Sequence, residues 1–174
     1  PVMAEPARGF YSNAFHVTLS TELSDAVIRY TTDFQEPGTN SPVYTAPILV
    51  SNTTILRAAS FKEGYQRSPF VTHSYIYHES VLNQGNSPPG WPATWGSKTA
   101  EYEVRPNVID DHSTEENLAF LRFLPTVSIV SEMDYLFDDD TGIYDNPKSK
   151  GEAWERSSST EWISTQGESG FGVN

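Results

Sequence analysis

The sequence predicts an all-β protein in which short strands are joined by turns. Three observations lead to this fold class. Residues that favour strands and turns are abundant, with nine Tyr, nine Phe and four Trp beside eleven Gly and twelve Pro. Apolar and polar residues alternate repeatedly before position 78, and helix signals are weak in that part of the chain. About five or six strands within roughly eighty residues favour a β-sandwich.

Five segments of the first half have the pattern of strands with one face toward a core. Apolar residues alternate with polar ones along most of them, so that every second side chain points to the same side. Turn residues separate the segments, among them Pro37 with Gly38 and, at a hairpin bend, Gly64. The predicted strands are 15–19, 26–32, 47–51, 54–61 and 70–77.

The second half of the chain has a different character. It opens with residues 83–92, which are polar and rich in Pro and Gly, as is typical of a linker or an ordered surface loop. Ser113, followed by Glu115 and Glu116, predicts a capped short helix that ends before Pro125. Further along, we expect strands at 126–130 and 159–165 and a helical turn at 132–137.

These patterns divide the chain into three segments. Residues 1–78 form the sandwich, residues 79–112 are a Pro/Gly-rich linker or ordered loop, and residues 113–174 are mostly β and loop-rich with one short helix. Because the chain begins with Pro and closes on Gly-Phe-Gly-Val-Asn, we expect it to be a piece of a longer protein.

The net charge of −12 is concentrated in the second half. Residues 1–78 carry five Lys/Arg and six Asp/Glu, whereas residues 79–174 carry six and seventeen. Such a surface repels phosphates, so nucleic acid and anionic membranes are excluded as partners. No apolar run is long enough to predict a membrane span. The absence of Cys excludes disulfides and thiolate metal sites.

Residues 9–77 resemble the chitobiase/β-hexosaminidase C-terminal domain, also described as fibronectin-III-associated. The resemblance implies an immunoglobulin-like sandwich. One departure is Phe34, which stands where that family usually has Gly; because Phe tolerates positive φ poorly, we expect a different turn there. The resemblance is carried by residues 9–11, 15–20, 28–33, Glu36-Pro37, Tyr44, Pro47-Ile48, 53–58, Ser68 and Tyr75-Ile76.

The second half resembles the region that follows such a domain in large bacterial proteins with a CotH-like (spore-coat kinase-like) domain. In that family the kinase core lies beyond the stretch matched here, so the resemblance implies that this chain holds the approach to the core and no active site. The likeness is carried by residues 88–96, 124–129, Leu136-Phe137, 141–147, Gly151 and 154–156.

Aromatic side chains are the main candidates for ligand binding. Exposed Trp and Tyr rings stack on the flat C–H faces of sugar rings, and nearby amides and carboxylates bind the hydroxyls. We take Trp91, Trp95, Trp154 and Tyr65 as candidate carbohydrate-binding residues. The alternative for Trp91 and Trp95 is that they fold back to seal the edge of the sandwich, and for Trp154 that it packs in a core.

Asp138, Asp140 and Asp145 lie close together in sequence around a predicted turn. Carboxylate oxygens are ligands that Ca²⁺ prefers, so these residues form a candidate calcium site, although their spacing is not that of an EF-hand. The alternative is an acidic turn surrounded by water. Calcium is the only cofactor considered.

No set of residues predicts catalysis. The sequence lacks a nucleophile elbow and a phosphate-binding glycine loop, and acid pairs such as Glu101 with Glu103 are frequent enough to occur by chance. His16 and His73 alternate with apolar neighbours in predicted strands, which places them toward solvent or a neighbouring strand.

We therefore expect a non-catalytic, secreted or cell-surface accessory module of a larger, polysaccharide-associated bacterial protein. Its partners would be a polysaccharide or glycan and the downstream domain of the same polypeptide. The alternative function is a structural spacer that positions a downstream CotH-like domain.

Overall fold

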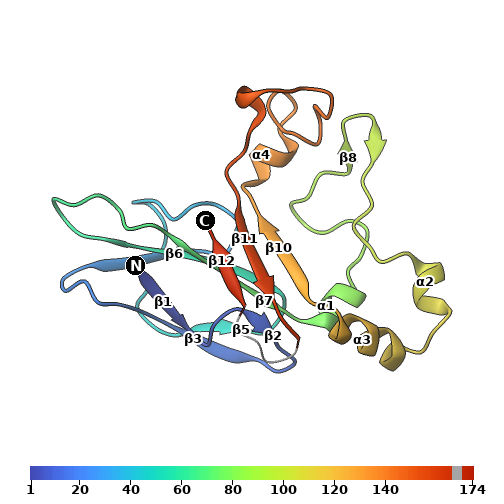
Figure 1. Cartoon of the computed structure of the whole chain (residues 1–174), viewed down its shortest axis with the longest axis horizontal. Coiled ribbons are helices and arrows are strands. Elements are labelled where there is room, and N and C mark those ends of the chain that lie inside the picture. Colours follow the sequence, from blue (N-terminus) through green and yellow to red (C-terminus); the bar gives the residue numbers. More distant parts are fainter. Residues whose placement is uncertain (166–169) are drawn as a thin grey trace.

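The computed structural model describes residues 1–165 and 170–174 and confirms the all-β prediction. Two sheets built from the first half face each other, with strand orders β1-β3-β5 and β2-β7-β6-β4 (Figure 1). Neighbouring strands pair antiparallel, except that β2 runs parallel to β7. The strands are β1 (Val2–Glu5), β2 (Gly9–Phe10), β3 (Phe15–Thr21), β4 (Val27–Thr31), β5 (Ile48–Val50), β6 (Thr54–Phe61) and β7 (Val71–Ile76).

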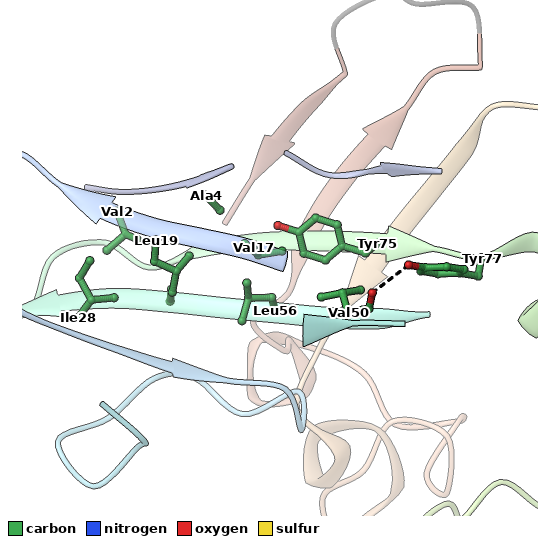
Figure 2. Close-up of a cluster of buried hydrophobic side chains, with 10 residues drawn as sticks. Val2, Ala4, Val17, Leu19, Ile28, Val50, Leu56, Tyr75 and Tyr77 are labelled. Atoms are coloured by element: carbon green, nitrogen blue, oxygen red, sulfur yellow. Dashed lines mark hydrogen bonds between the residues drawn. The ribbon is translucent and has the colours of Figure 1, made fainter. Parts of the chain in front are cut away.

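The five strands predicted in this half are therefore confirmed as β3 to β7. The sequence analysis missed β1, which pairs with β3, and the two-residue β2. Every second residue of β1 and β3 lies in the core, where these residues meet β6 and β7 (Figure 2). The buried apolar residues of this core are Val2, Ala4, Val17, Leu19, Ile28, Val50, Leu56, Ala58, Tyr75 and Tyr77.

The two histidines of the predicted strands differ in environment. His16 on β3 is exposed, whereas His73 on β7 is only 8% exposed and its Nδ1 accepts a hydrogen bond of 3.1 Å from the Arg8 N–H. Burial, with a smaller contribution from the positive charge of Arg8, lowers the pKa of His73 to about 4. His73 is thus a neutral interior residue that does not face solvent.

This burial predicts a loss of stability in mild acid. The unfolded chain binds a proton at His73 below about pH 6.5, while the folded state does not until about pH 4. The free energy of unfolding should therefore fall as the pH drops through this window, by at most about 3 kcal/mol. Urea unfolding at pH 7, 6, 5 and 4 measures the change. His73→Gln should flatten the dependence and His16→Gln should leave it intact; an unchanged slope in His73→Gln would contradict the assignment.

The described residues of the second half form four α-helices: α3 is the predicted short helix, and α4 lies within the helical turn predicted at 132–137. The Ser113 hydroxyl accepts from the Glu116 N–H, while the Glu116 carboxylate accepts from the Ser113 N–H, which forms a capping box at its start. The other three helices have five residues each and no side-chain cap, which explains why the sequence signals revealed at most a helical turn there. The helices are α1 (His78–Leu82), α2 (Pro106–Asp110), α3 (Thr114–Phe123), α4 (Met133–Phe137) and the 3-10 turn η1 (Glu152–Trp154).

A third sheet crosses the sandwich at an angle (Figure 1). It consists of β10 (Thr126–Val130), β11 (Ser159–Ile163) and β12 (Phe171–Val173), all antiparallel, with β11 in the centre. The first two were predicted and β12 was not. A small hairpin, β8 (Thr94–Trp95) with β9 (Lys98–Thr99), completes the strands of the described residues.

The third sheet packs on the outer side of β7 through polar side chains. The Thr72 hydroxyl donates to the Ser159 hydroxyl at 2.8 Å, and the Ser74 N–H donates to Glu161 Oε1 at 3.2 Å. The Ser74 hydroxyl also donates to Glu161 Oε2. Because its one proton is used in that hydrogen bond, the Ser128 hydroxyl, 2.7 Å away, donates to the Ser74 oxygen. The hydroxyl groups of Thr72, Ser74 and Ser159 and the Glu161 carboxylate thus have partners in this contact.

An ion pair crosses the same contact. Arg8 Nε lies 3.2 Å from Glu161 Oε1, and Glu161 is only 1% exposed. Burial raises the pKa of Glu161, while the hydrogen bonds from Ser74 and the charge of Arg8 act in the opposite direction. A Cβ atom at Gly172 would lie 1.7 Å from Arg8 Nη1, so a larger residue at this position of β12 would require the guanidinium to shift. The division at residues 78 and 112 remains a prediction; these contacts join its first and third segments.

Candidate binding cleft

A cleft of about 820 Å³ lies between the sandwich and the elements around the third sheet. One wall comes from β4, the loop after it and the β5–β6 turn. The opposite wall comes from β10 and α4, and α1 with the following loop contributes the remainder. The two sides also meet directly, because the Glu36 N–H donates to Glu132 Oε1 at 3.1 Å. The cleft therefore exists only because the first and third segments are held together.

The lining of the cleft is uncharged. It combines aromatic rings with hydroxyl and amide groups and with aliphatic side chains, and none of the described lining residues is Asp, Glu, Lys, Arg or His. In a protein with 20% charged residues, about four of twenty lining positions would be charged by chance, so the absence is informative. The aromatic residues are Tyr30, Phe34 and Trp91, and the hydroxyl and amide residues are Thr32, Asn52, Thr53, Thr54, Ser80, Gln84, Ser128 and Ser131.

Trp91 is held in the cleft wall by other rings. Its ring meets those of Phe34, Tyr102 and Phe137 edge to face, with centroids 5.8, 5.2 and 5.8 Å away. Such pairs each stabilise the arrangement by about 0.5–1.5 kcal/mol beyond burial. The ring is half-buried, so it is fixed in orientation and still lines the cleft.

Phe34 adopts the left-handed conformation, with φ of 69°. The turn therefore keeps the positive φ that Gly adopts most readily, and it does so with a bulky side chain, at a cost of about 1–2 kcal/mol. Two contacts offset this cost: the ring packs on Trp91, and the Phe34 carbonyl accepts a hydrogen bond of 2.6 Å from Arg57 Nη1. The presence of Phe34 at this position is thus explained by its place in the wall of the cleft.

Arg57 holds the loop after β4, which contains Phe34, in place. This residue of β6 is only 2% exposed, and its guanidinium lies 4.4 Å from the centroid of the Phe70 ring. Its Nη2 lies 4.0 Å from Glu36 Oε1, and Arg67 pairs with the other oxygen of Glu36 at 3.1 Å. Arg57 is therefore a positioning residue for Phe34 and does not itself line the cleft.

Of the four predicted carbohydrate-binding residues, the structure brings only Trp91 to the cleft. Trp95 belongs to the adjoining aromatic cluster, where its Nε1–H donates to the Tyr102 hydroxyl at 3.0 Å. Trp154 is half-buried with the guanidinium of Arg156 5.4 Å from its ring. Tyr65 is 68% exposed near a hairpin bend on the sandwich. Trp95 folds back onto Tyr102 and Tyr144 of the second half, so the contacts of its ring are not with the edge of the sandwich.

The sequence analysis did not identify the other cleft residues. Tyr30 lies within the predicted strand 26–32 and Asn52 directly after the predicted strand 47–51, and neither position has a local pattern that indicates a binding site. One sign of the cleft was available in the sequence, namely Phe34 at a position where Gly is usual. A bulky residue in a strained backbone conformation indicates that its side chain is needed at that place.

The three predicted calcium ligands do not converge. Asp138 Oδ1 accepts from the N–H groups of Asp140 and Thr141 and from the Thr141 hydroxyl, and these hydrogen bonds lower the pKa of Asp138. Asp145 Oδ1 accepts from the Gly96 N–H at 2.7 Å. Within residues 1–165 and 170–174, no three His, Cys, Asp or Glu side chains are grouped to hold a metal ion. The calcium site remains a prediction that no described contact supports.

A comparison with protein families supports the assignment of the first half. Residues 6–72 match the model of the chitobiase/beta-hexosaminidase C-terminal domain. This segment is therefore similar to that domain family, which is a family of non-catalytic accessory domains. A search of curated proteins found no match. The CotH-like character of the second half remains a prediction. In the described part of the chain, no helix is long and apolar enough to cross a membrane.

Proposed function

We propose that this protein is a secreted or cell-surface accessory module that binds a neutral polysaccharide chain in the cleft between its sandwich and its third sheet. The observation that carries the proposal is the lining: aromatic rings, amides and hydroxyls without a single charged side chain.

The chemistry of this lining matches an uncharged sugar. Trp91, Phe34 and Tyr30 offer apolar surface for the C–H faces of a sugar ring, while Asn52 and neighbouring Thr and Ser hydroxyls offer donors and acceptors for its hydroxyl groups. An anionic sugar would have no cationic partner there, and burying an unpaired charge is costly. Uronic acid polymers are therefore disfavoured.

The same lining supports a binding role in preference to hydrolysis. Glycoside hydrolysis needs two carboxyl groups about 5 to 9.5 Å apart across the sugar, and no carboxyl group is among the described lining residues. The non-catalytic nature of the matched domain family agrees with this role.

Affinity electrophoresis through gels that contain soluble glucan, mannan, xylan, glycol chitin or polygalacturonate tests the proposal. We expect retention by at least one neutral polymer and none by polygalacturonate. Trp91→Ala should weaken the binding about tenfold or more. Since Trp91 also stabilises its neighbours, Asn52→Ala is the second variant, because it removes an amide from the lining and leaves the ring cluster intact.

The matched controls are Tyr65→Ala and Trp154→Ala. Each removes an aromatic residue that was predicted to bind carbohydrate but lies outside the cleft. Both should bind like the original protein. Absence of retention by every neutral polymer, or equal weakening by the controls, would refute carbohydrate binding in the cleft.

The second candidate is the structural spacer. It is favoured by the polar contact between β7 and the third sheet, which fixes the angle between them as a spacer requires. If no polysaccharide retains the protein while its fold is stable, the spacer is the function that remains.

A further inference from the structure

Two exposed aliphatic side chains line the cleft from opposite walls. Leu49 of β5 is 60% exposed and Ile129 of β10 is 70% exposed, and both belong to the lining. Single exposed aliphatic residues are common on protein surfaces. Here, however, two of them border one cleft together with the half-buried Trp91. The cleft therefore offers a ligand aliphatic surface in addition to its aromatic rings.

Many hydroxyl groups of the lining already donate their one proton inside the protein. The hydroxyls of Thr53, Thr54 and Ser131 donate to backbone carbonyl groups, at 3.3, 2.9 and 2.8 Å. The Ser128 hydroxyl donates to the Ser74 oxygen, as described above. These groups can therefore offer a ligand only acceptors.

The side-chain amide of Asn52 supplies a donor. Asn52 is exposed in the turn after β5, three residues beyond Leu49, and it belongs to the lining. Its Oδ1 accepts from the Thr54 hydroxyl at 3.3 Å, while its Nδ2 donates to no acceptor among residues 1–165 and 170–174. An N–H donor and an aliphatic side chain are thus neighbours on the same wall of the cleft.

An acyl group has the chemistry that this pair recognises, because it joins a carbonyl acceptor to an apolar carbon. An acyl group with its own carboxylate is disfavoured, since the described lining has no cation. A long acyl chain would need a continuous apolar wall, but Ile129 and Val130 lie between Ser128 and Ser131. The lining therefore suits the acetyl group, which has a single methyl.

We propose that the cleft selects neutral polysaccharides whose sugars carry acetyl groups. The acetyl methyl lies between Leu49 and Ile129, and the acetyl carbonyl accepts from the Asn52 amide. This inference rests on the proposed function and specifies its ligand class. The group can be an O-acetyl ester or an N-acetyl amide, because both present the same methyl and carbonyl. Burial of one methyl tightens binding about fourfold.

Matched pairs of ligands test the preference. Affinity electrophoresis compares acetylated glucomannan and acetylated xylan with the same polymers after alkali has removed their acetyl esters. Calorimetry compares pentamers of N-acetylglucosamine and of glucose. We expect the acetylated member to bind about fourfold or more tightly in at least one of these comparisons, and that comparison then identifies the ester or the amide as the source.

Substitutions in the lining should reduce the ratio of the two affinities. Leu49→Thr and Ile129→Thr each replace an aliphatic side chain by a polar one that suits a strand, so each should bring the ratio toward one. Asn52→Asp should act similarly, because it removes the N–H donor and keeps the shape. The matched control is Val127→Thr, which changes a 54% exposed residue of β10 outside the described lining and should keep the ratio.

The outcomes separate this inference from the proposed function. Retention by neutral polymers with equal affinity for both members of every pair would overturn the acetyl preference and leave carbohydrate binding in place. A preference that persists in both Leu49→Thr and Ile129→Thr would overturn the position assigned to the methyl group. Absence of retention by every neutral polymer would refute the proposed function and this inference with it.

Discussion

Glu161→Ala should lower the free energy of unfolding by about 3–5 kcal/mol, the largest effect expected of any single substitution in this chain. The change leaves the Arg8 guanidinium, only 20% exposed on its side chain, without its partner 3.2 Å away. It also removes the acceptor of the fully buried Ser74 N–H. A buried charge and a buried donor thus become unsatisfied together.

Urea unfolding followed by circular dichroism measures this loss. Exposed Glu155→Ala is the matched control and should change stability by less than about 0.5 kcal/mol. Arg8→Met combined with Glu161→Leu should recover part of the loss, because a buried pair replaced by apolar residues is often close to neutral. If Glu161→Ala is as stable as the control, the polar contact does not hold the third sheet in place.

Arg57→Met is expected to cost about 3–4 kcal/mol. Methionine keeps much of the volume but removes the donor, 2.6 Å from the Phe34 carbonyl, and the charge beside Glu36. The carbonyl belongs to a residue with φ of 69°, so the loop loses one of the two contacts that offset its strain. The fluorescence of Trp91, whose ring meets Phe34, should shift to longer wavelength as the cleft wall loosens.

Urea unfolding gives the stability, and emission spectra of the folded variant in a Trp91→Phe background show which tryptophan reports the shift. The exposed Arg105, which pairs with the exposed Glu101 four residues earlier, supplies the control Arg105→Met, with an expected effect below about 0.5 kcal/mol. A stable Arg57→Met protein with unchanged emission would contradict the positioning role of Arg57.

Only part of the candidate site could be predicted from the sequence. The emphasis on aromatic residues led to Trp91, which lines the cleft, whereas Trp95 packs against Tyr102 and Tyr144 of the second half. The cleft as a whole could not be predicted from the sequence, because its walls are formed by residues that are far apart in the chain, among them Phe34, Asn52, Trp91 and Ser128. No local pattern records that such residues meet.

The sandwich could be predicted from the sequence alone, since alternation along each strand is a local property that decides which face enters the core. The same holds for α3, through a capping box of neighbouring residues. The tertiary structure was needed to show that the third sheet buries Ser159 and Glu161 together with Val130 and Ile163, while Val127, Ile129 and Phe171 are exposed. Alternation predicts that a strand has two unlike faces, but partners elsewhere in the chain, here Ser74 and Arg8, decide which of the two is covered.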